Sequence, residues 1–500
     1  MSSGSGFRAL AAVDLGAESG RVMLARFDGQ RLTLKEARRF PNQPVTILGR
    51  RFWNILGLWS ETLAGLRKAR SQSGALDSVG VDTWGVDYGL VDEAGLLTSQ
   101  PYHYRDHRTD GVMERVFATT PRDEIYARTG IQFMPINTLY QLYAHEQACP
   151  VDLERARRLL LIPDLLHAWL SGAQVSERTN ATTTQCWDPV AGRWAGDLLE
   201  RLNIPTHLLP PVVEAGAVLG DALPEVRDEI GPARIIAPAT HDTGSAIVAT
   251  PTRQTDGWAY ISSGTWSLVG AETTRPILTS AALEGNWTNE GGVFGTTRFL
   301  KNVMGLWLLQ ECQRAWARDG QPQQYDALLA AIDDTPPRAP LIDPDDLRFL
   351  APDDMPAAIN AYLREHGEAP LQSPAAFTVC ILQSLVLRYC QALRQLERIT
   401  GVGVSTIHVL GGGSRNAPLN QWLADAFGTP VVAGPTEATA LGNALMQLVG
   451  LGELGSLADI REIAARATTR TFTPRAERLA HWVEAQQRFD MLTGERVTRP

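Results

Sequence analysis

The stretch ALAAVDLGAESGR, residues 9–21, is an apolar run that ends in a loop of small residues. The run predicts a buried strand, and residues 22–27 predict a second strand that returns after the loop. A small-residue turn between two strands can direct backbone N–H groups at an anion. Gly16 and Gly20 permit the dihedral angles and the close approach that such a loop requires. Asp14 lies at the end of the strand, where a metal–phosphate group would be met.

A second stretch repeats this pattern about half a chain later. Residues 258–261 predict a strand that ends in the loop SSGTWS, residues 262–267, and residues 268–270 return. Two such loops, one in each half of the chain, could hold a polyphosphate from both sides. The alternative is two unrelated hairpins, and the loops alone do not decide between these interpretations. Arg21 could likewise pair with phosphate or with a neighbouring carboxylate.

A third stretch, APATHDTGS at residues 237–245, precedes a predicted helix. The simpler interpretation is that Asp242 or Thr240 is the N-cap of that helix. His241 and Asp242 also form a titratable pair on a turn of small residues. Taken alone, this turn favours the cap, and the rest of the chain has to decide whether Asp242 also takes part in chemistry.

Polar and aromatic side chains alternate unusually often between residues 82 and 188. Asp82 and Asp87 flank a Trp-Gly pair, which is typical of a polar pocket with an aromatic wall, although a bulged strand is the alternative. Together these residues predict a polar cavity. The sequence leaves open which of them would touch a ligand and which would support the pocket: Asp82, Asp87, Arg105, Asn137 and Gln141.

Composition limits the classes of protein to which the chain can belong. A chain of 500 residues predicts two or three domains. The formal net charge of −9 disfavours a nucleic-acid surface and polybasic membrane binding. None of the three lysines follows a glycine, which excludes a Walker-type phosphate loop. Five scattered cysteines without a C-x-x-C pair, no signal peptide and no long apolar run predict a cytoplasmic protein that does not bind membranes.

Strands alternate with helices through the second half, which favours an α/β fold. Residues 406–410 predict a strand that opens onto Gly411-Gly412-Gly413, and residues 437–449 predict a helix with small residues for close packing. A helix is also predicted to begin at residues 300–310. Residues 333–371 are predicted to form a looped insertion, and a domain boundary is predicted after residue 248.

The order of these motifs resembles the FGGY carbohydrate kinases, and the resemblance spans nearly the whole chain. It is carried by DLGAESGR (14–21), SGTWS (263–267) and GGGSRN (411–416). Further matching motifs, which point to the members that act on L-rhamnulose, are GVDTWGVD (80–87), YRDHRTD (104–110), TGIQF (129–133), NTLYQ (137–141), TNATTT (179–184), HDT (241–243), NEGG (289–292) and LKNVMGLWLLQ (300–310).

The resemblance implies two ribonuclease-H-like domains, as in actin and hexokinase, with the active site in a cleft between them. Residues 1–248 would mainly bind sugar and residues 249–500 mainly ATP. It implies ATP-dependent phosphorylation of L-rhamnulose at its C1 hydroxyl, with ATP and Mg²⁺ as cofactors. The alternatives are a kinase for another ketose or polyol, such as fuculose or xylulose, and a non-enzymatic nucleotide switch of the actin-like fold. The sequence carries no signal of oligomeric state.

The resemblance also implies roles for individual residues. Asp242 would be the general base, and Asp14 would hold Mg²⁺ through water. Glu18 departs from the family pattern, which often has a small hydroxyl residue there, so we expect its side chain to point outward or to reach the metal shell. The nucleotide would be bound by Ala17, Glu18, Ser19, Gly20, Arg21, Thr265, Gln310 and Gly412, and the sugar by Gly85, His241, Asp242, Thr243 and Asn302.

Overall fold

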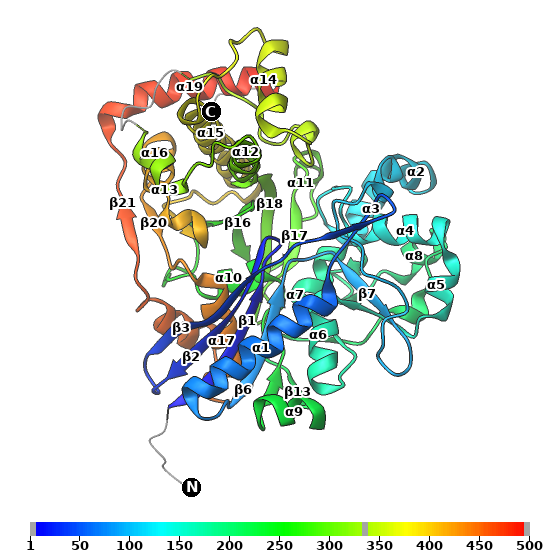
Figure 1. The fold of residues 1–500 in the computed structure, drawn as a ribbon. Helices are drawn as coiled ribbons and strands as arrows, with labels where there is room; N and C mark the ends of the chain where they lie inside the picture. Colours follow the sequence, from blue (N-terminus) through cyan, green and yellow to red (C-terminus); the bar gives the residue numbers. More distant parts are fainter. Residues whose placement is uncertain (1–6, 333–338, 495–500) are drawn as a thin grey trace. The chain divides into compact units, whose positions relative to one another are not determined.

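A computed structural model describes residues 7–332 and 339–494, which divide into two units (Figure 1). The first unit comprises Met1–Arg253, Glu272–Leu300 and Glu437–Ala467, and the second comprises Gln254–Ala271, Lys301–Thr436 and Thr468–Pro500. The first unit therefore takes in two segments from beyond residue 249. The division passes through two strands, β16 (Trp266–Thr273) and β18 (Thr297–Met304).

The first unit is built on a six-stranded sheet. Its order is β13 (Val218–Asp221), β14 (Arg234–Ile236), β6 (Ser78–Thr83), β1 (Arg8–Leu15), β2 (Ser19–Phe27) and β3 (Leu32–Pro41). Strands β1, β2 and β3 pair antiparallel in sequence, whereas β6 pairs parallel with both β1 and β14. The core residues of β1 are fully buried, as the apolar run predicts.

The helices of the first unit lie around this sheet and around smaller two-stranded ladders, among them β7 (Tyr88–Val91) with β8 (Arg158–Leu161). They are α1 (Ile55–Ser73), α2 (Val112–Thr119), α3 (Arg122–Thr129), α4 (Thr138–Ala148), α5 (Pro150–Arg155), α6 (Ile162–Ser171), α7 (Arg178–Ala181), α8 (Gly196–Arg201), α9 (Pro224–Ile230), α10 (Asp242–Val248), α11 (Ser280–Glu284), α17 (Ala438–Gly450) and α18 (Leu457–Ala464).

The sheet of the second unit repeats the arrangement of the first. Strand β15 (Trp258–Ser263) pairs antiparallel with β16 and parallel with β19 (Thr406–Leu410), which pairs parallel with β20 (Val431–Ala433). The seven-stranded sheet has the order β17-β18-β16-β15-β19-β20-β21, where β17 is Thr288–Gly291 and β21 is Arg470–Phe472. Its first strand, β17, belongs to the first unit. The same pattern, a hairpin followed by parallel strands, surrounds β1. The two loops noted in the sequence therefore lie at equivalent places in two sheets of the same topology. The helices of this unit are α12 (Trp307–Arg318), α13 (Tyr325–Ala330), α14 (Met355–Glu365), α15 (Pro374–Thr400), α16 (Ala417–Phe427) and α19 (Leu479–Thr493).

Helix α17 packs directly against α10, although the two are far apart in sequence. A Cβ atom on Gly442 would lie 1.8 Å from the Ser245 carbonyl oxygen, so only glycine permits this approach. The small residues predicted to allow close packing therefore do so. This contact brings α17 to the back of the turn that contains Asp242.

Local structure differs from the sequence prediction at two places near the candidate site. Residues 300–310 do not form one helix, because β18 continues to Met304 and α12 begins only at Trp307. The N-cap of α10 is His241 and not Asp242 or Thr240, and the His241 side chain makes no capping hydrogen bond. Asp242 is the first residue of the helix, where a negative charge still favours the helix dipole.

Two further features explain the composition of the second unit. Helix α15 is the one helix of the described part long and apolar enough to cross a membrane, and 83% of that apolar window is buried within the protein. All five cysteines, two in the first unit and three in the second, are free. The predicted insertion at 333–371 contains helix α14, and its residues 333–338 lie outside the described residues.

Candidate active site

Three aspartates come to the same edge of the first sheet. Asp14 and Asp82 end the parallel neighbours β1 and β6 and face each other in register. The segment before Asp242 extends the row, because Thr83 and His241 form a parallel bridge in which Thr83 N donates to the Thr240 carbonyl at 2.9 Å. The structure therefore brings the stretches 9–21 and 237–245 together at one edge of the sheet.

The loop between β1 and β2 is a tight turn, because Gly16 N donates to the Ser19 carbonyl at 3.0 Å. Ala17, Glu18 and Ser19 are half-buried. Neither glycine of the loop has a left-handed backbone, so the expectation that they permit unusual dihedral angles is wrong. Gly20 is required instead by packing, since a Cβ atom there would lie 2.3 Å from the Phe40 ring.

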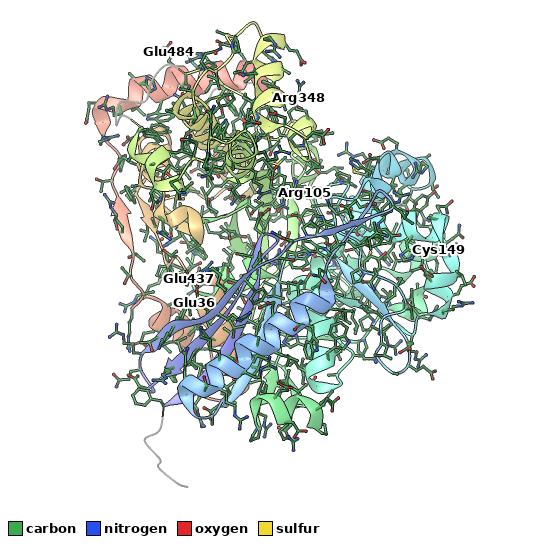
Figure 2. The ribbon with its side chains drawn as sticks, viewed as in Figure 1. Glu36, Arg105, Cys149, Arg348, Glu437 and Glu484 are labelled. Atoms are coloured by element: carbon green, nitrogen blue, oxygen red, sulfur yellow. The ribbon has the colours of Figure 1, made fainter. Side chains whose placement is uncertain are left out.

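Arg21 is committed to carboxylates. Its Nε and Nη2 lie 2.8 and 2.7 Å from Asp14 Oδ2, and Nη1 forms an ion pair with Glu437, the residue before α17 that Figure 2 labels. Burial lowers the pKa of Arg21, but Asp14 and Glu437 raise it by more. The sequence left open whether Arg21 pairs with phosphate or with a carboxylate. In the structure it pairs with the carboxylates of Asp14 and Glu437.

Asp14 fits a magnesium ion that takes most of its ligands from phosphate and water, as Mg²⁺ commonly does. The side chain is buried, Arg21 occupies Oδ2, and no described residue pairs with Oδ1. The described part of the chain holds no group of three His, Cys, Asp or Glu that could enclose a metal by itself. Oδ1 of Asp14 is therefore an oxygen that the protein can offer to such an ion.

Asp82 is held from behind by α17. Asn443 Nδ2 donates to Asp82 Oδ2 at 2.6 Å, and Gln447 Nε2 donates to Asn443 Oδ1 at 2.7 Å. Burial raises the pKa of Asp82 well above its usual range, and the charge of Asp14 adds to this effect. Asp82 therefore supports the row of aspartates as a buried, amide-bound group.

Asp87 organises an aromatic wall and is saturated with donors. Its Oδ2 accepts from the indoles of Trp53 at 2.5 Å and Trp84 at 3.0 Å and from Tyr104 N at 3.2 Å, and its Oδ1 accepts from Gln141 Nε2 at 2.8 Å. Burial raises the pKa of Asp87 to about 6.

Gln141 and Asn137 are likewise occupied within the protein. Gln141 Oε1 accepts from Arg108 at 2.7 Å, and Asn137 Nδ2 donates to Gln185 Oε1 at 3.0 Å and to the Gln132 carbonyl at 2.8 Å. Of the candidates for sugar contact, Asp87, Gln141 and Asn137 thus have the contacts of supporting residues. Arg105 is buried, with its guanidinium 5.2 Å from the Tyr104 ring centre.

The turn that carries Gly85 is strained. Val86 has φ of 70°, which is unfavourable for a β-branched residue. Its N–H donates to Thr183 Oγ1 at 3.3 Å, and its carbonyl accepts from Thr138 Oγ1 at 2.6 Å. A Cβ atom on Gly85 would lie 3.0 Å from Thr183 Oγ1, so this turn is fixed from two sides.

The turn before α10 directs the carboxylate of Asp242. Thr243 donates to Asp242 Oδ1 from its backbone N at 2.5 Å and from Oγ1 at 3.2 Å, and His241 Nε2 lies 3.5 Å from the same oxygen. No described residue donates to Oδ2. Burial raises the pKa of Asp242, His241 opposes this rise, and the charge of Asp14 adds to it.

Two nucleotide candidates of the second unit lie beside the end of β15. Thr265 is on the β15–β16 turn, and its carbonyl accepts from Gly305 N and Trp307 N, both at 3.2 Å. Gly412 follows β19, and a Cβ atom on the adjacent Gly413 would lie 2.1 Å from Ser263 Oγ. The loops that contain Thr265 and Gly412 therefore follow the neighbouring strands β15 and β19.

The other two candidates of this unit lie on β18 and α12. Asn302 is on β18 and half-buried. Gln310 is in the first turn of α12, and its buried Oε1 has no hydrogen-bond partner among the described residues. An orphaned buried acceptor is what a ligand donor would satisfy.

The fold and the row of aspartates define a two-domain α/β enzyme, and comparisons with known proteins identify its family. The models of the N-terminal and C-terminal domains of the FGGY family of carbohydrate kinases match residues 9–249 and 259–451. The chain belongs to the FGGY family of carbohydrate kinases. It is therefore a sugar kinase that uses ATP.

Relatives and solved structures agree with this assignment. The chain is 44% identical over 490 residues to a rhamnulokinase of Pectobacterium atrosepticum, covering 97% of this chain and 96% of that protein. It is 40% identical over 481 residues to a rhamnulokinase of Bacteroides thetaiotaomicron, covering 96% and 98%. Gluconate kinase from Lactobacillus acidophilus has a TM-score of 0.79 at 15% identity, covering 98% of each chain. Glycerol kinase of Plasmodium falciparum with ADP has a TM-score of 0.75 at 13% identity, covering 99% of each. The two structures confirm the predicted fold class.

Sequence reasoning gave no role to several residues that complete the site. Glu290 is part of a motif noted in the sequence, but nothing there pointed to His241 as its partner. No pattern in the sequence pointed to a role in the site for Arg298, Asn443 or Glu437. Only the pairing of β17 with β18 and the packing of α17 bring these residues to the row of aspartates.

Proposed function

We propose that this chain transfers the γ-phosphoryl group of ATP to the C1 hydroxyl of L-rhamnulose, giving L-rhamnulose 1-phosphate and ADP. The family assignment supports the reaction class. The choice of sugar is supported by relatives of 40–45% identity, named rhamnulokinase, that match nearly the full length of the chain. The observation that carries the mechanism is the open Oδ2 of Asp242 at the edge of the sheet that also presents Asp14.

Asp242 is proposed as the general base. Its Oδ1 is occupied by donors from Thr243 and faces His241, which leaves Oδ2 to accept the proton of the attacking hydroxyl. The raised pKa of Asp242 makes the carboxylate a stronger base than an ordinary aspartate. In phosphoryl transfer, positioning and electrostatic stabilisation matter at least as much as the base.

The remaining assignments divide between sugar and nucleotide. We propose that residues 1–248 mainly bind the sugar, through Gly85, His241 and Thr243, and that Asn302 adds a contact from β18. We propose that residues 249–500 mainly bind ATP, through Thr265, Gln310 and Gly412. The loop from Ala17 to Arg21 would meet the phosphates, with Arg21 exchanging a carboxylate partner for phosphate. Asp14 would hold Mg²⁺, which when bound offsets charge on the phosphates.

A panel of sugars in an ADP-release assay tests this function. L-rhamnulose is expected to have the highest kcat/KM among L-rhamnulose, L-fuculose, D-xylulose and glycerol. A higher value for another sugar would keep the kinase and change its substrate. Tight ATP binding without turnover of any sugar would contradict the proposed reaction and favour a nucleotide switch.

A further inference from the structure

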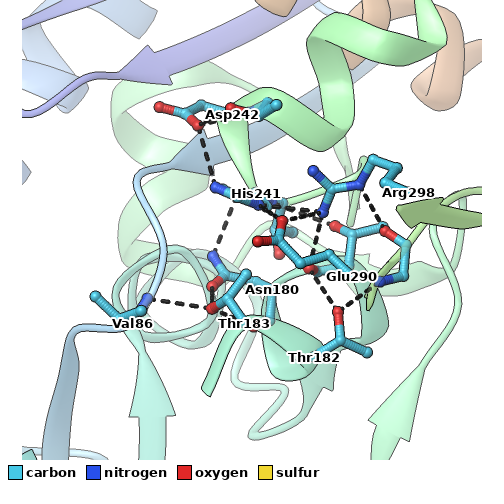
Figure 3. Close-up of polar contacts among 12 residues, drawn as sticks. Val86, Asn180, Thr182, Thr183, His241, Asp242, Glu290 and Arg298 are labelled. Atoms are coloured by element: carbon cyan, nitrogen blue, oxygen red, sulfur yellow. Dashed lines mark hydrogen bonds and ion pairs between the residues drawn. The ribbon is translucent and has the colours of Figure 1, made fainter. Parts of the chain in front are cut away.

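A buried ion pair lies behind the proposed base. Glu290 is on β17 and Arg298 on β18, and their exposed fractions are 4% and 1%. Figure 3 shows both side chains directed at the ring of His241, on the side away from Asp242. Neither residue has a role in the function proposed above. Burying two charges is costly unless they are paired, so their presence beside His241 requires an explanation.

The three side chains form a closed triangle around one ring nitrogen. Arg298 Nη2 lies 3.1 Å from His241 Nδ1 and 3.1 Å from Glu290 Oε2, and Glu290 Oε2 lies 3.2 Å from His241 Nδ1. Burial raises the pKa of Glu290, but Arg298 and His241 outweigh it and lower the pKa overall. Glu290 is therefore a carboxylate that holds the guanidinium in place.

Two backbone carbonyls also accept from the guanidinium, one from Nε and one from Nη2. Arg298 Nε donates to the Gly291 carbonyl at 2.8 Å, and Nη2 donates to the Thr179 carbonyl at 3.3 Å. Gly291 is itself held, because its N donates to Thr182 Oγ1 at 2.7 Å. Arg298 thus presents its donor to the histidine ring from a rigid position.

Two groups face Nδ1: the Arg298 guanidinium, which can only donate, and Glu290 Oε2, which can only accept. Glu290 Oε2 makes no hydrogen bond with a described residue, so the hydrogen bond at Nδ1 is the one from Arg298. When Arg298 donates to Nδ1, a neutral His241 must carry its proton on Nε2. Nε2 lies 3.5 Å from Asp242 Oδ1, so the ring N–H faces that oxygen. Together with the two donors of Thr243, this leaves Oδ2 of Asp242 as the oxygen open to an acceptor hydroxyl.

We propose that Glu290 and Arg298 are positioning residues for phosphoryl transfer, which act through the tautomer of His241 on the orientation of the Asp242 carboxylate. This inference rests on the proposed role of Asp242 as the base. Neither residue needs to touch sugar or nucleotide for this effect. Their loss should therefore lower kcat while leaving KM for ATP nearly unchanged.

A double-mutant cycle separates positioning from general support of the fold. Glu290→Gln keeps the shape of the side chain and should lower kcat about tenfold, because a misdirected base loses much of its effect. In an Asp242→Asn background the same change should alter kcat less than about twofold, since residues that act as a unit are not additive. Arg298→Lys keeps the charge but not the planar fork of the guanidinium. We expect it to change kcat in the two backgrounds in the same way as Glu290→Gln does.

Asp425→Asn is the matched control, because it also removes a buried carboxylate from an arginine, here Arg475 in the second unit. It should lower stability without changing kcat. Ring ¹⁵N shifts of His241, assigned by comparison with His241→Asn, should show a proton on Nε2 in the unliganded wild type. In Arg298→Met, which removes the donor, the proton should move toward Nδ1, which faces Glu290 Oε2.

The outcomes distinguish this inference from the proposed function. Equal losses of kcat from Glu290→Gln in both backgrounds, or a wild-type ring protonated on Nδ1 alone, would overturn the positioning role while Asp242 remained the base. Normal turnover by Asp242→Asn would overturn the base itself, and with it the positioning role. Non-additive loss together with the Nε2 tautomer would support both.

Discussion

Asn443 Nδ2 lies 2.6 Å from Asp82 Oδ2 and joins helix α17 to strand β6 in the core of the first unit. The same amide lies 3.2 Å from the Gly80 carbonyl, and Gln447 lies behind it. Asn443 and Asp82 are both fully buried. A helix from near the C-terminal end of the chain therefore satisfies the polar groups beneath the row of aspartates.

Replacing Asn443 with alanine should destabilise the protein by about 1–3 kcal/mol, because the Asp82 carboxyl and the Gly80 carbonyl lose a buried donor. Urea unfolding measures the change. Thr439→Ala on the same helix is the control, since no described residue hydrogen-bonds to the Thr439 side chain, and it should change stability by less than about 0.5 kcal/mol. Equal losses in the two variants would show that the Asn443–Asp82 bond adds nothing.

Gly20→Ala should destabilise the protein by about 1–3 kcal/mol through overpacking, since the new methyl group would lie 2.3 Å from the Phe40 ring. Phe40→Leu should partly rescue it, so that the double variant loses less than the sum of the single losses. Thermal unfolding of the three variants tests this coupling. Additive losses would mean that Gly20 is needed for a reason other than the Phe40 contact.

Val86→Gly should stabilise the fold by up to about 1 kcal/mol, because glycine relieves the left-handed backbone at a modest cost in chain entropy. Val190→Gly, at an exposed position without a positive φ, should instead destabilise it. Chemical unfolding of both variants measures the difference in sign. A loss of stability in Val86→Gly equal to that in Val190→Gly would contradict strain at the turn.

Asp87 should make stability depend on pH between about 4 and 6. Its pKa is raised from 3.8 to about 6 in the folded protein, so the unfolded chain releases the proton first as pH rises. The contribution of the protonated group is present below about pH 4 and is lost by about pH 6, on the order of 3 kcal/mol. The stability of the wild type relative to Asp87→Asn, measured by urea unfolding, should fall across this range. A constant difference would contradict the raised pKa.

The sequence predicted those parts of the fold that depend on local pattern. The apolar run before Asp14, the loop before Trp266 and the small residues of α17 each formed the predicted element. The prediction that one helix begins at residues 300–310 was wrong, although the spacing of Val303, Leu306 and Trp307 fits a helix. Strand β18 nevertheless continues to Met304, since its pairing in the sheet outweighs that spacing.

The sequence predicted less of the site, because long-range contacts build it. His241 and Asp242 share one turn and could be recognised together. Arg298 reaches His241 only because β18 brings it there, 57 residues later in the chain. The need for Gly20 could not be derived either, since it follows from the position of Phe40 across the β2–β3 ladder.

Turnover of Asp242→Asn tests the central claim most directly. The amide cannot accept the proton of the C1 hydroxyl, so kcat with L-rhamnulose and ATP should fall about 10²- to 10⁴-fold. ATP binding, measured by calorimetry, should stay within about twofold of the wild type. A variant free of wild-type enzyme that turns over L-rhamnulose at the normal rate would contradict Asp242 as the base.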